Sequence, residues 1–162
     1  MKWDYEFDVV VVGSGNGALT SALFSHDGGA KTLVIEKSDQ YGGTSATSGG
    51  GVWIPNNRYA KAENVDDSDQ DARDYINSVS PEGKIKDELV EIYIAEGPKM
   101  INYLHENSQV KYRNLPHYPD YFPDNPGGKA GNRSMEPEPI NGTKLGEDLG
   151  RLREQHPQTA FT

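Results

Sequence analysis

The residues with the clearest chemical potential form a glycine-rich turn near the N-terminus, followed about 20 residues later by an acidic residue. The turn reads Gly13-Ser14-Gly15-Asn16-Gly17-Ala18 and matches the pattern G-x-G-x-x-G/A, with Ala18 in the last place. Gly13 permits a tight turn, Gly15 lets the backbone approach a pyrophosphate, and Ala18 lets a helix pack closely on a strand. Glu36 stands where a ribose-binding carboxylate belongs. This spacing predicts a dinucleotide-binding site.

Such a site needs a strand, a helix and a second strand to hold it. Asp8–Val12 is a short β-branched run suited to a buried parallel strand. The helix that follows the glycines would present free N–H groups and the positive end of its dipole to the phosphates. Thr32–Ile35 forms the second strand, directly before Glu36. The predicted fold class is therefore α/β, a Rossmann-like βαβ unit. The alternative is an ordinary strand–turn–helix with incidental glycines.

A second run of small and hydroxylated residues, Gly42–Gly51, follows the second strand. Small residues let the backbone contact a flat ring system, and Thr44, Ser45 and Ser48 can donate hydrogen bonds to pyrophosphate or ring oxygens. An NAD enzyme needs little beyond the first glycine turn, so this second block favours FAD over NAD; a flexible surface loop is the alternative. The candidate cofactor-binding residues are Gly13, Ser14, Gly15, Asn16, Gly17, Ala18, Glu36, Lys37, Gly43, Thr44, Ser45, Ser48, Gly49 and Gly50.

Composition excludes several other classes of site and partner. The 162 residues include no cysteine, which excludes disulfides and thiolate metal sites, and the four histidines are too far apart to form a metal site. The net charge of −9 makes nucleic acid an unexpected partner. The N-terminal segment has no apolar signal region, and no run approaches the length of a membrane span. We expect a cytoplasmic protein without a membrane span.

The chain divides by composition into three segments. Residues 1–57 begin the FAD-binding domain, residues 58–114 are a helical insertion, and residues 115–162 are a loop-rich segment contributing to a substrate pocket. A mainly helical and loop-rich extension thus follows the βαβ unit, and no confident long strand follows Trp53. The last dozen residues carry no periodic pattern. We therefore expect an incomplete domain, the front part of a larger protein.

Three helices are predicted in the middle segment. Ser68 and the acidic residues behind it predict a capped helix that ends at Val79. Pro81 is predicted to open a longer helix whose packing face is given by 3.6-residue spacing. Gly97-Pro98 is expected to break this helix, with a short third helix following it. The predicted packing face consists of Ile85, Leu89, Ile92 and Tyr93.

Three separated blocks of this sequence resemble a known group. GSGNGALTSAL, VIEK and GGTSATSGGGVWIPNN are similar to the FAD domain of the fumarate reductase/succinate dehydrogenase flavoprotein superfamily. Within it, the continuation Trp53–Asn56 and the segment Tyr118–Pro123 resemble the 3-ketosteroid dehydrogenases, chiefly the Δ1 enzymes, as do Gly127–Lys129 and Gly131–Ser134 behind them. The resemblance runs from about Asp8 to Leu145, over most of the chain.

The resemblance implies removal of two hydrogens from ring A of a 3-ketosteroid. A base takes a proton α to the ketone, and the adjacent carbon gives a hydride to flavin N5. It implies further that Tyr121, directly after Asp120, is a catalytic residue that assists a second tyrosine acting as the base. Because free tyrosine has a pKa near 10, support from a second tyrosine is chemically sensible. The expected partners are a steroid substrate and an external electron acceptor.

The sequence departs from the family pattern in two ways, which affect the predicted attachment of FAD and the predicted activity of this chain. Some relatives attach FAD covalently through a histidine in the second glycine block, but residues 40–53 contain none, so we expect non-covalent FAD. Family members are longer, and their remaining catalytic groups come from regions outside this sequence, so we do not expect turnover by this chain alone. Two alternatives stay open: a soluble fumarate-reductase-like flavoprotein acting on another activated C–C bond, and a non-catalytic nucleotide-binding remnant.

Overall fold

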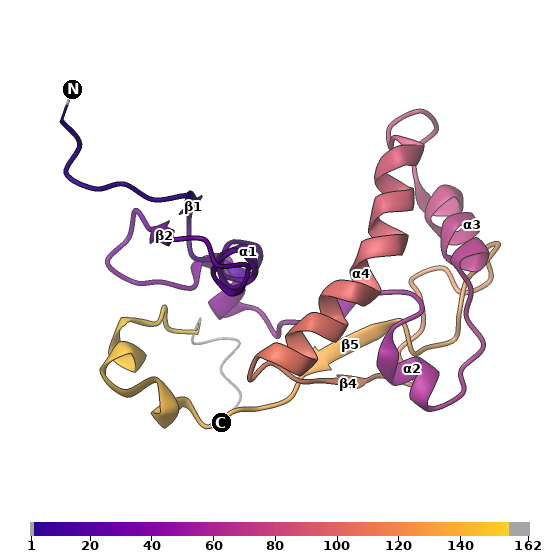
Figure 1. The fold of residues 1–162 in the computed structure, drawn as a ribbon. Helices are drawn as coiled ribbons and strands as arrows, with labels where there is room; N and C mark the ends of the chain where they lie inside the picture. Colours follow the sequence, from indigo (N-terminus) through magenta and orange to yellow (C-terminus); the bar gives the residue numbers. More distant parts are fainter. Residues whose placement is uncertain (1, 156–162) are drawn as a thin grey trace. The chain divides into compact units, whose positions relative to one another are not determined.

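The computed structural model describes residues 2–155, which form two compact units. The described part of unit 1 comprises residues 2–50 and 141–155, and unit 2 comprises residues 51–140 (Figure 1). Each unit has its own secondary structure and its own cavity.

Unit 1 contains the βαβ element predicted from the glycine-rich turn. Strand β1 (Val9–Val12) pairs in parallel with strand β2 (Thr32–Ile35), in a register that runs from Val9 opposite Thr32 to Val12 opposite Ile35. Helix α1 (Asn16–Asp27) connects them and contacts both strands. The first strand begins one residue later than predicted, and the Asp8 carboxylate instead accepts a hydrogen bond from the Lys31 N–H at 2.8 Å. The α/β fold class is confirmed.

Two 3₁₀ segments complete unit 1. The first, η1 (Gly43–Thr47), lies in the second glycine block, and the second, η2 (Gly142–Arg151), lies far along the chain. Tyr41 connects the two regions: its N–H donates to Arg151 O and its carbonyl accepts from Arg153 N–H, each at 2.9 Å. This pairing brings the segment after residue 150 back to the end of β2.

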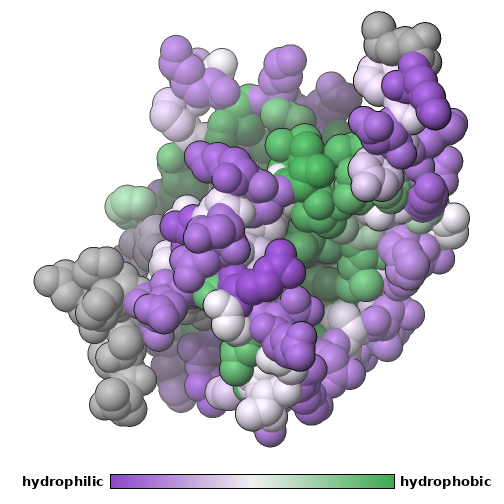
Figure 2. All heavy atoms as spheres, turned by 90° about the vertical axis from the view of Figure 1, so that its left-hand side faces the viewer, coloured by the Kyte–Doolittle hydropathy of each residue, from purple (hydrophilic) through white to green (hydrophobic). Residues whose placement is uncertain are grey.

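The β1–β2 pair leaves part of its apolar surface open. Val9 and Val11 are half-buried, whereas Val10 and Val12 are exposed, Val12 to 79%. This alternation is what a strand covered by a helix on one face produces. Figure 2 shows hydrophobic side chains, in green, at the molecular surface among hydrophilic ones.

Unit 2 combines three helices with a small antiparallel sheet of order β3-β5-β4. The strands are only two to four residues long, which agrees with the expectation that no long strand follows Trp53 among the described residues. The sheet itself was not predicted. The elements of unit 2 are β3 (Val52–Trp53), α2 (Arg58–Ala62), α3 (Asp69–Val79), α4 (Asp87–Asn107), β4 (Tyr112–Asn114) and β5 (Ser134–Pro137).

Helix α3 begins and ends where the sequence predicts. Ser68 is its N-cap, and the Ser68 hydroxyl oxygen accepts a hydrogen bond from the Asp71 N–H at 3.0 Å. Ala72 of α3 packs with Val90 and Ile94 of α4 in a buried core cluster. These contacts fix α3 against α4.

Helix α4 differs from its prediction at both its start and its middle. It begins at Asp87 rather than at Pro81, because Gly83 has a φ of +67° and interrupts the helical backbone there. It also continues through Gly97 and Pro98, so the predicted break and separate third helix are wrong. An internal proline costs about 3 kcal/mol. Burial of the α4 face on both sides of Pro98 offsets this cost, at about 1.5–3 kcal/mol for each large aliphatic side chain.

The buried face of α4 is also not the predicted one. Its buried positions are Val90, Ile94, Gly97, Ile101 and Leu104. The predicted face (Ile85, Leu89, Ile92 and Tyr93) is largely exposed, with Leu89 at 57%. Both stripes are apolar at helical spacing, so the period alone could not choose between them. Packing chooses the stripe that contains Gly97, where a Cβ atom would lie 3.2 Å from Ile54 Cδ1.

None of the helices within residues 2–155 has the length and apolar character needed to cross a membrane. No three histidine or acidic side chains of the same residues gather in a way that could hold a metal ion.

Candidate functional site

A cavity of about 590 Å³ in unit 1 lies at the end of both parallel strands. The carboxyl ends of parallel strands are where nucleotide cofactors bind in doubly wound folds. Its lining includes seven of the predicted cofactor-binding residues, together with Val12, Ile35 and Arg153, which were not predicted. The seven are Gly13, Ser14, Gly15, Glu36, Lys37, Gly43 and Thr44.

The glycine turn has the backbone geometry that its sequence predicts. Gly13 has a φ of +98°, a conformation that favours glycine, and its N–H donates to Ile35 O at 2.7 Å. Gly15 is the N-cap of α1 in extended conformation. A Cβ atom at Gly43 would lie 3.5 Å from Gly15 Cα, so the two glycine segments run close together. Because these positions are glycines, few side-chain atoms surround the N-terminus of α1.

Ser14 and Glu36 form a hydrogen-bonded pair inside this cavity. The buried Ser14 hydroxyl donates to Glu36 Oε2 at 2.5 Å and accepts from the Gly42 N–H at 2.9 Å. Glu36 Oε1 accepts from the Ser38 N–H at 3.1 Å. The Ser14 hydrogen bond, followed by that from Ser38, holds the pKa of Glu36 below its usual value. Glu36 is therefore ionised at neutral pH and is an acceptor suited to ribose hydroxyls.

The second glycine block reaches the first through Ser45. Its hydroxyl oxygen accepts a hydrogen bond from the Asn16 N–H at 2.9 Å. This N–H is one of the amides at the start of α1 that have no acceptor within the helix. Of the other predicted cofactor-binding residues, Gly17 and Ala18 lie in the first turn of α1, and Ser48, Gly49 and Gly50 follow η1. These five do not line the cavity, and their cofactor role stays a prediction.

Of the three lining residues that the sequence did not predict, Arg153 is the charged one. The Arg153 Nε atom is buried without a hydrogen-bond partner, one of two such side-chain atoms in the described part of the chain. Its backbone is fixed by pairing with Tyr41. An unsatisfied guanidinium nitrogen in a cavity with glycine-rich walls suits a phosphate-containing dinucleotide. No sequence motif surrounds Arg153; only the pairing of distant segments brings it here.

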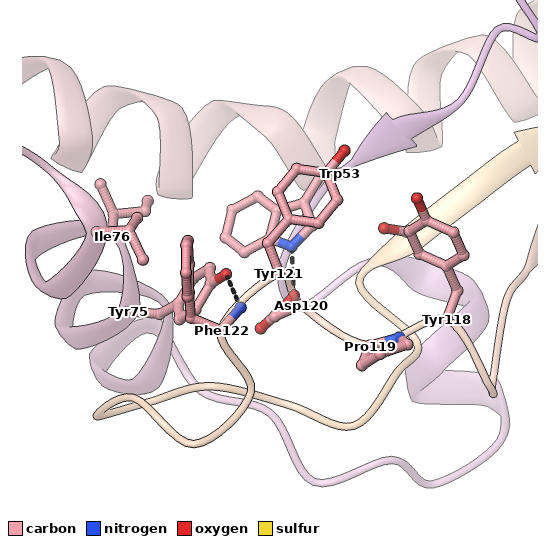
Figure 3. A pocket seen from close by; sticks show the side chains of 10 residues that line it. Trp53, Tyr75, Ile76, Tyr118, Pro119, Asp120, Tyr121 and Phe122 are labelled. Carbon is pink, nitrogen blue, oxygen red and sulfur yellow. Dashed lines mark hydrogen bonds between the residues drawn. The ribbon is translucent and has the colours of Figure 1, made fainter.

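A second cavity, of about 460 Å³, lies in unit 2 (Figure 3). Its walls are mainly aromatic and aliphatic, and they come from β3, α3 and the loop before β5. Such a cavity suits a flat, apolar ligand. The lining consists of Trp53, Tyr75, Ile76, Val79, Tyr118, Pro119, Asp120, Tyr121, Phe122 and Ser134.

The candidate catalytic residue Tyr121 stands in this lining. Its side chain is 82% exposed, whereas Asp120 just before it is buried. The Phe122 N–H, just after it, donates to the Tyr75 hydroxyl at 3.3 Å (dashed line in Figure 3). Tyr121 is therefore a free side chain on a backbone that is fixed on both sides.

Glycines allow the loop that carries Tyr121 to pack against its neighbours. A Cβ atom at Gly127 would lie 2.0 Å from Asp71 O of α3, and one at Gly131 would lie 2.0 Å from Pro116 O. The Lys129 side chain adds an ion pair to Asp71 at 2.9 Å. The Gly127-Gly128-Lys129 block thus fastens the Tyr121 loop to α3.

Trp53 fixes the other wall of the cavity. Its indole packs near the rings of Tyr75 and Tyr93, with centroid distances of 5.8 Å and 6.3 Å. The Trp53 Nε1–H donates to Asp120 Oδ1 at 2.6 Å, and the Tyr93 hydroxyl donates to the Trp53 carbonyl. The Trp53 motif, predicted as part of the steroid-branch resemblance, therefore holds both an aromatic wall and the Tyr121 loop.

Known proteins resemble this chain along most of its length. Residues 8–161 match the model of the FAD binding domain family. The chain is 44% identical over 147 residues to a 3-oxosteroid 1-dehydrogenase of Mycobacterium tuberculosis, covering 91% of the chain and 26% of the relative. It is 37% identical over 156 residues to a 4-oxocyclohexanecarboxylate 2-dehydrogenase of Sinomonas cyclohexanicum, covering 96% of the chain and 27% of the relative.

A solved structure is similar in fold as well as in sequence. The crystal structure of 3-ketosteroid Δ1-dehydrogenase from Sterolibacterium denitrificans, in complex with 1,4-androstadiene-3,17-dione, matches with a TM-score of 0.89 and 40% identity. The match covers 94% of this chain and 27% of that one. The chain thus spans about a quarter of the length of the curated relatives it matches.

These comparisons confirm the resemblance to 3-ketosteroid dehydrogenases inferred from the sequence motifs. They also confirm FAD as the predicted cofactor, whereas its non-covalent attachment stays a prediction. Because the family model matches residues 8–161, nearly the whole chain, this chain belongs to the FAD-binding domain family.

Proposed function

We propose that the protein containing this chain is an FAD-dependent dehydrogenase that desaturates ring A of 3-ketosteroids. The observation that carries the proposal is the position of Tyr121 at an aromatic cavity of about 460 Å³. That volume lies within the range of about 300–1,000 Å³ typical of small-molecule sites. The similarity to 3-oxosteroid 1-dehydrogenases supports the choice of a steroid as the ligand.

The cavity of unit 1 would bind FAD, and the cavity of unit 2 would bind the steroid. FAD, when bound, supplies the acceptor for the hydride that leaves the steroid. In unit 1, Glu36 would hold the ribose hydroxyls, and the glycine turn with Arg153 would hold the pyrophosphate. In unit 2, the apolar walls would exclude water from the steroid, and the Tyr121 hydroxyl would donate or accept a hydrogen bond where a proton is removed next to the ketone.

A smaller cyclic ketone is the second candidate substrate. The relative from Sinomonas cyclohexanicum, whose name gives 4-oxocyclohexanecarboxylate as its substrate, is 37% identical. The same α-proton removal next to a ring ketone would serve either substrate. The cavity of unit 2 has no cationic lining residue to pair with a carboxylate, which favours the steroid. The ratio of kcat/KM for androst-4-ene-3,17-dione to that for 4-oxocyclohexanecarboxylate decides between them.

The test of the proposed reaction compares two tyrosines that line the same cavity. Tyr121→Phe removes the candidate catalytic hydroxyl, and Tyr118→Phe removes a neighbouring hydroxyl as a matched control. Loss of a proton-transfer partner lowers turnover by about 10²–10⁴-fold. We therefore expect Tyr121→Phe to lose steroid dehydrogenation by this factor with FAD still bound, while Tyr118→Phe stays close to wild type. Unchanged turnover in Tyr121→Phe would remove its catalytic role.

An external electron acceptor would reoxidise the flavin after each turnover. The protein would act in the cytoplasm. Residues 1–57 would begin the FAD-binding domain, residues 58–114 would be a helical insertion, and residues 115–162 would be a loop-rich segment that contributes to the substrate pocket. Two residues cross this division, since Trp53 lines the unit 2 cavity and Arg153 lines the unit 1 cavity.

A further inference from the structure

An ion cluster that the proposed reaction does not use lies buried beneath the Tyr121 loop. Arg133 is at its centre, with its side chain only 2% exposed. Its Nη2 and Nε atoms donate to the two carboxylate oxygens of Asp67, at 2.7 Å and 3.1 Å. Its Nη1 atom donates to Asp120 Oδ2 at 2.9 Å. Asp67 and Asp120 are 4% and 2% exposed, so one guanidinium neutralises one of two buried carboxylates.

Aromatic rings enclose the same guanidinium. The Arg133 guanidinium carbon lies 5.4 Å from the Trp53 ring centroid and 5.7 Å from that of Tyr75. Both rings also line the unit 2 cavity. A charge held between two aromatic faces is stabilised by their quadrupoles, about 2 kcal/mol when desolvated. The cluster therefore shares its walls with the candidate substrate cavity.

Asp120 is held from several directions. Its Oδ1 atom accepts from Trp53 Nε1 at 2.6 Å, and its Oδ2 atom accepts from Arg133 Nη1 and from the Lys129 N–H, at 2.9 Å and 3.0 Å. Its own N–H donates to Lys129 O at 3.0 Å. The residue before Tyr121 is thus fixed by side chain and backbone alike.

Stability alone does not explain this arrangement. Burying charges costs several kcal/mol per ion, and apolar residues of the same volume often stabilise a core as well or better. The cluster instead gives one carboxylate a fixed orientation, because the Asp120 side chain accepts three hydrogen bonds, one of which is its ion pair with Arg133. Because Tyr121 is 82% exposed, the position of its hydroxyl depends on the backbone that Asp120 holds.

We propose that Asp120, held by Arg133 and Trp53, is a positioning residue that sets the place of the Tyr121 hydroxyl in the cavity. This inference rests on the proposed function for the role of Tyr121. A misplacement of about 1 Å at a reacting group costs about 10²-fold in rate. Loosening Asp120 should therefore lower kcat and leave steroid binding nearly unchanged.

A double-mutant cycle in the FAD-loaded protein that contains this chain tests the coupling. Asp120→Asn should lower kcat for androst-4-ene-3,17-dione about 10²-fold with little change in KM. In a Tyr121→Phe background the same substitution should have no further effect, because the hydroxyl it positions is gone. Glu136→Gln, which changes an exposed carboxylate in the same unit, is the control and should keep wild-type rates. Equal fold losses in both backgrounds would overturn the proposal.

Hydrogen exchange separates this inference from the proposed function. In the 162-residue chain, Asp120→Asn should speed amide exchange across residues 116–130 and leave α4 unchanged. The Lys129 amide loses its carboxylate acceptor, and the backbone hydrogen bond from the Asp120 N–H to Lys129 O weakens as the loop loosens. Unchanged exchange in the loop would overturn the proposal whatever the enzyme activity. If wild-type protein leaves steroid unreacted, the proposed function fails and the loop exchange alone decides the positioning role.

A milder variant covers the case in which Asp120→Asn does not fold. Arg133→Lys keeps the positive charge and loses the planar fork that reaches both carboxylates. Like Asp120→Asn, it should lower kcat in the wild-type background. In the Tyr121→Phe background it should have no effect on kcat. A kcat loss that persists in that background would overturn the proposal.

Discussion

Replacing Arg133 with methionine should strongly destabilise unit 2. The change keeps much of the side-chain volume but leaves Asp67 and Asp120 buried without their cation. Removing one partner of a buried ion pair costs about 3–5 kcal/mol. Since two carboxylates lose their partner here, we expect about 4 kcal/mol or more. With a urea m-value of about 1.5 kcal/mol/M, the unfolding midpoint falls by about 2–3 M.

The assay follows Trp53 fluorescence during urea unfolding in a Trp3→Phe background. The chain has two tryptophans, so the emission then reports unit 2 alone. Arg113→Met is the matched control, because Arg113 pairs with Glu136 at the surface, with exposures of 62% and 36%. An exposed pair contributes about 0–1 kcal/mol. If Arg133→Met moves the midpoint no further than Arg113→Met does, the reasoning about the buried cluster is refuted.

Three other predictions follow from local geometry. Gly127→Ala should destabilise unit 2 by about 1–3 kcal/mol or more in the same urea assay, because Gly127 has a φ of +72° and a Cβ atom would meet Asp71 O. Arg153→Gln should weaken FAD binding about 10-fold to 100-fold in a fluorescence titration, the effect of losing a charge-assisted hydrogen bond. Burial lowers the pKa of His105, so the unfolded chain binds protons more readily; the free energy of unfolding should therefore fall as pH drops below about 6.5, and His105→Gln should flatten that slope.

Each of these has a control within the chain. Gly83→Ala shares the positive φ of Gly127 but has open space around the added Cβ, so it should cost less; equal costs would contradict the predicted clash. Arg151→Gln is the control for Arg153→Gln, because Arg151 is an exposed arginine two positions before Arg153. Equal FAD affinity in the two variants would exclude a specific role for Arg153. A slope below pH 6.5 that His105→Gln leaves unchanged would assign the pH dependence to other groups.

The βαβ element could be predicted from the sequence because its signals are local. A β-branched run, a glycine turn and an acidic residue at fixed spacing predict the bounds of β1 and β2 within one residue, and they place α1 between the two strands. The Ser68 cap of α3 is local in the same way. Where two equally apolar stripes compete, as on α4, the outcome depends on tertiary packing, and the sequence-based prediction was wrong.

The parts that were missed depend on residues far apart in the chain. Arg133 pairs with Asp67, 66 residues away, and nothing around either residue marks it as buried. Arg153 reaches the unit 1 cavity only because Tyr41 pairs with the segment after η2. The strands of unit 2 are too short to show an alternating pattern. Such features follow from the packing of the whole unit rather than from any window of sequence.

The central claim is that an FAD held by this family of domains oxidises a 3-ketosteroid. The most direct measurement is the flavin absorbance spectrum of the FAD-loaded protein that contains this chain, recorded without oxygen before and after adding androst-4-ene-3,17-dione. The oxidised flavin band should bleach as the steroid is desaturated. An oxidised flavin band that the steroid leaves unchanged would contradict the central claim.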